Sequence, residues 1–337
     1  MQPAPSDLAA AIRRAIDGKT KPLGALGRIE TLAAQIAELQ GTLAPRMETC
    51  TLTIFAADHG IALEGVSAYP QAVTRQMVLN FLAGGAAATV FAAAQGIPVQ
   101  VVDAGVAGEP IADPHLLSHR IAAGTRSFLA GPAMDEAQAR QALETGRRLG
   151  AAAPGEAAAF GEMGIGNTAS AAMLGHKLTG LDLDGLVGRG TGLDDPGLAR
   201  KRRVLAAAAA RTPARLDPER ALAEYGGFEI AAMAGAMLGA ATAGRIVLVD
   251  GFIATAAAAA ALALEPAARR AMVFAHVSAE AGHRPLLDHL GAAPLLALDM
   301  RLGEGTGALL AWPLLRAAAA MLRDMASFES AGVSGPA

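Results

Sequence analysis

The chain has 337 residues, of which 53% are hydrophobic, 18% charged and 4% aromatic, with a formal net charge of −3 at pH 7. This composition predicts a soluble globular protein with a core of small aliphatic residues, and the slightly negative charge argues against a nucleic-acid partner. Cys50 is the single cysteine, which excludes an intrachain disulfide and a thiolate metal cage and is typical of a cytoplasmic protein.

No stretch of the sequence is predicted to cross a membrane. Residues 1–19 lack the apolar core of a signal peptide and are typical of an amphipathic helix. The two most apolar segments, residues 231–244 and 252–264, are shorter than the roughly 20 apolar residues that span a bilayer. We therefore expect both to form buried helices.

Short apolar or β-branched runs along the chain predict about six strands, with helical stretches rich in Ala, Leu and Met between most of them. The runs lie at residues 51–58, 97–105, 157–164, 245–252, 271–278 and 294–300. Because they are apolar throughout instead of alternating, these strands are expected to be buried on both faces. The pattern predicts an α/β fold with a doubly wound, mostly parallel sheet flanked by helices.

The two ends of the chain are predicted to be helical and to contribute no strand. We expect residues 1–45 and 306–337 to pack together as a small helical subdomain. Residues 46–305 would then form the α/β domain with the active-site crevice. Several predicted strands end in acidic or glycine-rich tails, namely ADHG, VDAG, GEMGIGN, VDGF, HVSAE and LDMRLGEG. In an open α/β sheet a ligand binds outside the carboxyl ends of the strands, so these tails should line one crevice.

Two glycine-rich loops are candidates for binding an anion. In GEMGIGNTAS (161–170), the glycines and the start of the next helix favour a phosphate or carboxylate, although a tight turn with an ordinary helix cap explains the same residues. The loop in VGRGTGLDDPGLARKRR (187–203) is followed by a basic helix, most of whose charges are expected to face solvent. Lys201 is the cation that we expect to reach back and neutralise a phosphate.

Glu304 stands between Gly303 and Gly305, directly after an apolar run. Such a carboxylate either caps a backbone N–H at a helix start or acts in a site. Gly303, Gly305 and Ala308 also match a dinucleotide-binding pattern, but that fold needs a further strand, and the chain continues as a helix. Residues 55–77 form a long polar segment that is expected to be a lid or pocket wall. No histidine spacing in the sequence matches a recognised set of metal ligands. The G-x-S-x-G motif of a serine hydrolase is absent.

The chain contains, in order, seven blocks that resemble one enzyme family: KPLGALGRIE (21–30), FAADHGIALEGVSAYPQAVTRQMVLNFLAGGAA (55–87), GEMGIGNT (161–168), RGTGLDDPGLARK (189–201), GGFEIAAMAGAMLGAA (226–241), LVDGFIATAAA (248–258) and SAEAGHRPLLDHLGAAPLLALDMRLGEGTGALLA (278–311). The family is nicotinate-nucleotide:dimethylbenzimidazole phosphoribosyltransferase, of cobalamin lower-ligand biosynthesis. The resemblance runs over residues 20–325, with Ala25 where a serine is expected.

The resemblance implies transfer of the 5-phosphoribosyl group of nicotinate mononucleotide to 5,6-dimethylbenzimidazole, giving alpha-ribazole 5'-phosphate and nicotinate. Nicotinate leaves from a cationic ring nitrogen, so neither a metal nor an organic cofactor is expected. The incoming benzimidazole must lose a proton, which calls for a general base. The resemblance also implies a homodimer. A phosphoribosyltransferase for another base and a non-catalytic nucleotide-binding sensor stay open as alternatives.

Site roles follow from the resemblance residue by residue. The implied catalytic residues are Glu304 as general base, Glu162 as a second carboxylate and Lys201 as the charge partner of the phosphate. The implied nucleotide-binding residues are Gly164, Gly166, Asn167, Thr168, Gly190, Ser278 and Gly303. The implied benzimidazole-binding residues are Ser67, Gln76, Met163 and Leu302.

Overall fold

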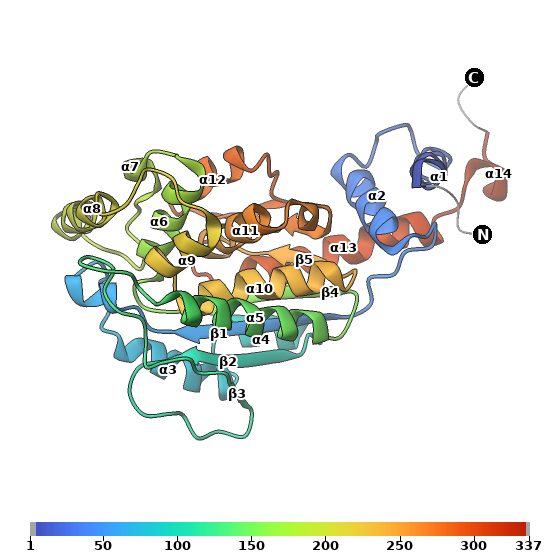
Figure 1. The fold of residues 1–337 in the computed structure, drawn as a ribbon. Coiled ribbons are helices and arrows are strands. Elements are labelled where there is room, and N and C mark those ends of the chain that lie inside the picture. Colours follow the sequence, from blue (N-terminus) through green and yellow to red (C-terminus); the bar gives the residue numbers. More distant parts are fainter. Residues whose placement is uncertain (1–4, 335–337) are drawn as a thin grey trace.

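The structure, a computed structural model, describes residues 5–334. Its centre is a six-stranded, wholly parallel sheet with the strand order β3-β2-β1-β4-β5-β6 (Figure 1). The strands are β1 (Cys50–Ala57), β2 (Val99–Gly105), β3 (Leu116–Ser118), β4 (Ala157–Met163), β5 (Ile246–Val249) and β6 (Met272–Phe274). The chain runs outward from β1 to β3 and then from β4 to β6 on the other side, so the predicted doubly wound α/β fold is confirmed.

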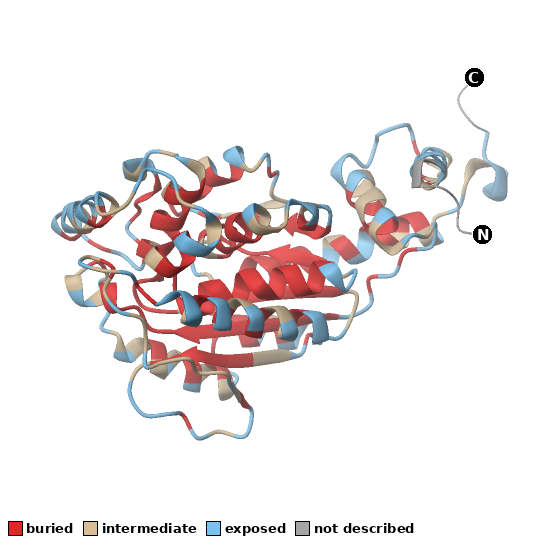
Figure 2. Ribbon diagram, in the orientation of Figure 1, coloured by how far each residue is buried: buried red, intermediate tan, exposed pale blue. Residues whose placement is uncertain are grey.

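Both faces of the sheet are buried, as the uninterrupted apolar strands predict. Along β1, Leu52 and Ile54 pack into one apolar core and Phe55 into another, because successive side chains of a strand point to opposite faces. The sheet and helix α10 are almost entirely buried in Figure 2.

Helices close the two cores from opposite sides of the sheet. The core that contains Phe55 is covered by α5 (Glu136–Ala152), α6 (Asn167–Thr179), α9 (Pro218–Tyr225), α10 (Phe228–Thr242) and α11 (Phe252–Leu264). The core that contains Leu52 is covered by α1 (Pro5–Asp17), α2 (Arg28–Gln40), α3 (Ala72–Leu82), α4 (Ala87–Ala94) and α13 (Thr306–Asp324). The remaining elements are η1 (Gly60–Glu64), α7 (Leu183–Leu186), α8 (Asp195–Ala209), η2 (Pro266–Ala271), β7 (His276–Val277), α12 (His283–His289), β8 (Leu296–Ala297) and α14 (Phe328–Ala331).

Helices α5 and α10 pack with their backbones almost touching, which requires glycine at the contact. A Cβ atom at Gly146 would come closer than 3.0 Å to the carbonyl oxygen of Ala232, and one at Gly235 would come as close to that of Leu143. Real Cβ atoms do not approach so near, so any side chain at these positions would force the helices apart. The many small residues of this chain therefore act as close-packing surfaces.

The strand predictions differ from the structure in two places. The run at 294–300 forms only β8, which pairs with β7 in a separate two-stranded sheet. The sixth strand of the main sheet is instead β3, which pairs with β2 and has no counterpart in the prediction. At three residues, β3 is too short to show an apolar pattern, so the sequence carries little signal for it.

The two ends of the chain meet on the side of the molecule away from the carboxyl ends of the strands (Figure 1). Thr20 donates its backbone N–H to Ala326 at 3.1 Å, and Phe328 donates its own to Gly18 at 3.0 Å. Helix α13 runs from the sheet to this end and packs against α2. The boundaries of the expected helical subdomain stay a prediction.

Candidate active site

A pocket opens at the carboxyl ends of β4 and β5 and is completed by the segments that follow β7 and β8. Four of the six acidic or glycine-rich tails line it, those of GEMGIGN, VDGF, HVSAE and LDMRLGEG. The other two tails bind backbone elsewhere: Asp58 accepts the N–H of Ala107 and Asp103 accepts that of Val106, both at 2.8 Å. The crevice therefore lies over the β4–β5 half of the main sheet, and the segments after β7 and β8 of the separate two-stranded sheet complete it.

The pocket gathers most of the site residues implied by the resemblance. Those that line it are Glu162, Met163, Gly164, Asn167, Thr168, Gly190, Ser278, Leu302, Gly303 and Glu304. Four others lie outside the lining. Gly166 is the N-cap of α6, and Lys201 is buried behind the wall of the pocket. Ser67 precedes α3 and Gln76 is exposed on it, and the roles of all fourteen residues stay predictions.

The turn that carries Glu304 is strained and is held by Asp250. Gly303, Glu304 and Gly305 all have positive φ, with Glu304 at 61°, a region that non-glycine residues rarely occupy. The Asp250 carboxylate, which follows β5, accepts the N–H of Gly305 at 3.2 Å and that of Ala308 at 2.9 Å. Asp250 thus caps α13 and fixes the turn, so that the Glu304 side chain is held at the pocket.

The Glu304 carboxyl group is 5% exposed and only partly hydrogen-bonded. The backbone N–H of Ala88, at the start of α4, donates to it, whereas Oε2 has no partner among the described residues. Burial raises the pKa of Glu304, the charge of Asp250 adds to the rise, and the Ala88 hydrogen bond opposes it. The Glu304 carboxyl group thus lies buried beside the start of α4 with Oε2 unpartnered among the described residues, and its role in the site stays a prediction.

Glu162 is linked to Glu304 through the backbone. Its Oε1 atom lies 3.4 Å from the Glu304 N–H, and its Oε2 atom accepts a hydrogen bond from the Asn167 side chain. A Cβ atom at Gly303 would collide with Oε1, so this glycine is needed for the two carboxylates to approach. Burial, followed by the charges of Asp250 and Glu229, raises the pKa of Glu162 well above its ordinary value. The pocket therefore joins two carboxyl groups whose pKa values are both raised, mainly by burial.

The loop around Gly190 has charged groups on both sides. Lys201 is fully buried, and its Nζ donates to Thr168 Oγ1 at 2.8 Å and to the Gly188 carbonyl at 3.2 Å. Burial lowers the pKa of Lys201 to about 8. On the pocket side, burial raises the pKa of Glu280 while the nearby Gly190 N–H lowers it, and Arg301 donates to the Gly190 carbonyl at 2.9 Å.

Two buried histidines near the site, His283 and His59, have hydrogen-bonding partners in the protein. Burial lowers the pKa of His283 to about 3, so the ring is neutral. Its Nδ1 accepts the Ser278 N–H at 2.7 Å, which places the ring proton on Nε2, 2.9 Å from Thr255 Oγ1. His59 lies 2.6 Å from Glu229. Within residues 5–334, no group of three or more His, Cys, Asp or Glu side chains could hold a metal ion.

Three charged residues of the pocket have no role in the sequence prediction: Asp250, Glu280 and Arg301. All three lie in tails that are expected from the sequence to line the crevice, namely VDGF, HVSAE and LDMRLGEG. Glu280 and Arg301 contact a loop about 90 and 111 positions away along the chain, and no local pattern indicates such a contact.

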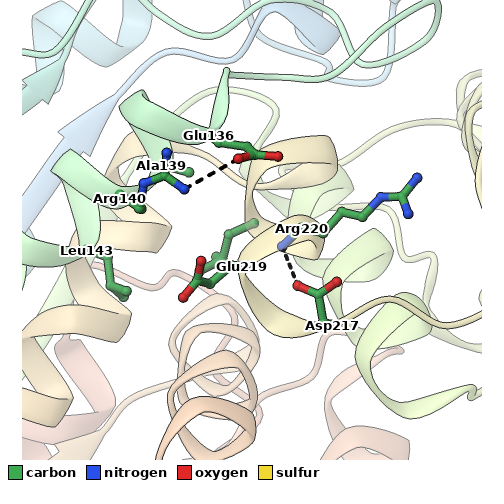
Figure 3. Close-up of a pocket in the computed structure, with 8 residues that line it drawn as sticks. Glu136, Ala139, Arg140, Leu143, Asp217, Glu219 and Arg220 are labelled. Atoms are coloured by element: carbon green, nitrogen blue, oxygen red, sulfur yellow. Dashed lines mark hydrogen bonds and ion pairs between the residues drawn. The ribbon is translucent and has the colours of Figure 1, made fainter.

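A second cavity lies between α5 and α9, and it contains none of the predicted site residues (Figure 3). Its charged side chains serve local contacts: Arg140 pairs with Glu136 at 3.4 Å, and Asp217 accepts the Arg220 N–H at 3.0 Å at the start of α9. The pocket at the strand ends contains ten of the predicted site residues and is therefore the better candidate for chemistry.

The comparisons with known proteins show the family of the chain. Residues 1–333 match a family model described as Phosphoribosyltransferase, so the class of protein is a phosphoribosyl-transferring enzyme. The chain is 55% identical over 327 residues to the nicotinate-nucleotide–dimethylbenzimidazole phosphoribosyltransferase of Variovorax paradoxus (strain S110), covering 97% of this chain and 94% of that protein. It is 57% identical over 326 residues to the enzyme of the same name from Cupriavidus necator, covering 96% and 94%.

A solved structure is also similar. The crystal structure of CobT from Thermus thermophilus superimposes with a TM-score of 0.94 at 47% identity, covering 97% of this chain and 99% of that chain. The chain belongs to the nicotinate-nucleotide–dimethylbenzimidazole phosphoribosyltransferase family.

Proposed function

We propose that this chain transfers the 5-phosphoribosyl group of nicotinate mononucleotide to 5,6-dimethylbenzimidazole, with Glu304 as the general base. The observation that carries this role is the Glu304 carboxyl group itself, which is buried at the pocket with Oε2 unpartnered among the described residues. Its raised pKa makes it a stronger base than an exposed glutamate. The relatives named for this reaction support the choice of substrates.

The proposed reaction is a single displacement at C1′ of the ribose. One benzimidazole nitrogen forms a bond to C1′, while the bond from C1′ to the nicotinate ring nitrogen breaks and its electron pair returns to that nitrogen. The proton on the other benzimidazole nitrogen passes to Glu304. Because the leaving ring is cationic before the step and neutral at its nitrogen afterwards, no extra negative charge develops on it.

The remaining predicted residues are assigned to binding. The phosphate would lie near the Gly190 loop and Thr168, with Lys201 supplying positive charge from behind the wall. Glu162, held by Asn167, would lie near the ribose. Met163 and Leu302 give an apolar wall for the benzimidazole, and Leu302 is 56% exposed, which leaves that side open to related bases.

The test is nicotinate release from nicotinate mononucleotide and dimethylbenzimidazole by wild type, Glu304→Gln and Glu265→Gln. Glu265 lies just beyond the far end of α11 and is a matched control. We expect release by wild type and the control, and its near loss in Glu304→Gln. Equal rates in all three proteins would overturn the assignment of the base. Binding of nicotinate mononucleotide without release would favour a sensor, and release only with another base would reassign the acceptor.

We also propose that the protein is a cytoplasmic homodimer that does not span a membrane. By length and composition alone the stretch Ala72–Ala94 could cross a bilayer, and only 28% of it is buried. Gly84, at φ +77°, separates it into α3 and α4, whereas a spanning segment needs one continuous helix. Leu79 and Val90 are exposed on it, and a second copy of the chain would cover them. Sedimentation should give a dimer that Leu79→Glu weakens, whereas Leu23→Glu, at an exposed leucine elsewhere, does not.

We further propose that residues 1–45 and 306–337 form a helical subdomain beside the α/β domain of residues 46–305. The hydrogen bonds between residues 18–20 and 326–328 support this division. The contact of α2 with α13 supports it as well. Limited proteolysis that releases fragments cut near residue 46 or 305 would agree with these boundaries, and cuts spread evenly along the chain would contradict them.

A further inference from the structure

Glu280 is an acidic side chain in the part of the pocket that needs to attract a phosphate. It follows β7 on the segment that carries Ser278, whose Oγ atom accepts the Glu280 N–H at 3.3 Å. The side chain is 8% exposed and lines the pocket. Burial raises the pKa of Glu280, while Lys201, the Gly190 N–H and Arg301 hold it down. Each of the groups that stabilise this carboxylate would equally stabilise another anion.

The glycine loop is shaped around this carboxylate. A Cβ atom at Gly188 would lie closer than 3.0 Å to Glu280 Oε2, so no other residue fits there without moving Glu280. Gly190 has a positive φ of 54°, its carbonyl accepts from Arg301, and its N–H is close enough to Glu280 to lower the pKa of that carboxyl group. A phosphate that is to accept the Gly190 N–H therefore competes with the Glu280 carboxylate for it.

Lys201 has no competing carboxylate in direct contact. Among the described residues it forms no ion pair within 4.0 Å, and its hydrogen bonds go to the neutral Thr168 hydroxyl and Gly188 carbonyl. Burial lowers the pKa of Lys201, and the negative charge of Glu280 partly opposes this fall. The fully buried cation is thus balanced at longer range by the same carboxylate that holds Gly190.

We propose that Glu280 is an internal competitor for the phosphate subsite, so that the phosphate of the nucleotide must displace its carboxylate to bind Gly190. The inference rests on the proposed function only for the identity of the ligand. The apparent affinity for phosphate is then the intrinsic affinity multiplied by the fraction of molecules in which Glu280 has moved away, so it is lower than the intrinsic value. The competition also favours ligands with a phosphate group, because only an anion can take the place of the Glu280 carboxylate beside Lys201 and Arg301.

The experiment measures binding of inorganic phosphate by calorimetry to wild type, Glu280→Gln and Glu280→Ala, with Glu265→Gln as the control for the loss of one negative charge. We expect the two Glu280 variants to bind phosphate about tenfold more tightly than wild type, because the competing charge is gone. The control should match wild type. Two substitutions are used because either one by itself could disturb the loop, and circular dichroism establishes which variants fold.

Weaker or unchanged phosphate binding in the folded variants would overturn the proposal, since Glu280 would then be a clamp that only shapes the loop. A second readout is the KM for nicotinate mononucleotide, which should fall in Glu280→Gln. Phosphate binding needs no turnover. A protein that never releases nicotinate but binds phosphate as expected would therefore reject the proposed reaction and leave this inference standing.

Discussion

The contact between Gly303 and Glu162 gives the sharpest test of how the site is assembled. Replacing Gly303 by alanine places a Cβ atom at a residue with φ +85°, which costs roughly 1–2 kcal/mol for an L side chain. That Cβ atom would also lie closer than 3.0 Å to Glu162 Oε1, so the turn or the carboxylate must shift by about 1 Å. Since a displacement of this size in a reacting site can cost about 10²-fold, we expect kcat/KM to fall about 10²-fold.

The matched control is Gly108→Ala. Gly108 has nearly the same backbone angle, φ +81°, but a Cβ atom there has no neighbour within 4 Å. Both variants should lose a similar free energy of unfolding in urea, whereas only Gly303→Ala should lose activity in the nicotinate-release assay. Equal kcat/KM values for the two variants would refute the idea that this contact positions the site.

Three further predictions follow from the buried carboxyl groups and the packed helices. Glu304→Gln should lower kcat about 10²–10⁴-fold. Folding raises the pKa of Glu304, so the stability that the protonated carboxyl group contributes is present at low pH and is lost as pH rises through the folded pKa. Glutamine stays uncharged at every pH, and the same variant should therefore unfold at a higher urea concentration than wild type at pH 7. Asp250→Asn should shift the acidic limb of the kcat profile to lower pH, because removing this charge lowers the pKa of the base; an unshifted limb would contradict the role of Asp250. Gly235→Ala should destabilise the protein by about 3 kcal/mol in urea unfolding, since it forces α10 from α5, whereas Gly131→Ala, with no neighbour within 4 Å, should cost less than about 1 kcal/mol.

Several features of the site are local in the sequence, and for that reason they could be predicted. Glu304 lies between two glycines, and Glu162, Asn167 and Thr168 lie within one strand-to-helix turn, so their relative placement follows from a few backbone angles. The structure brings these residues to one pocket. The local pattern could not predict which residues from distant parts of the chain lie beside these side chains, such as Ala88 at the start of α4, whose N–H faces Glu304.

The sequence by itself determined the α/β class, because strands buried on both faces consist mainly of apolar or β-branched residues, as β1, β4 and β5 do. Only the tertiary structure decided which runs join the main sheet: β8 pairs with β7 alone, and the three-residue β3 takes the edge position. It also decided the charged surroundings of the pocket, where Asp250 holds the Glu304 turn and Glu280 holds Gly190. The physical reason is that these bonds join segments far apart in the chain, whose approach depends on the packing of the whole sheet.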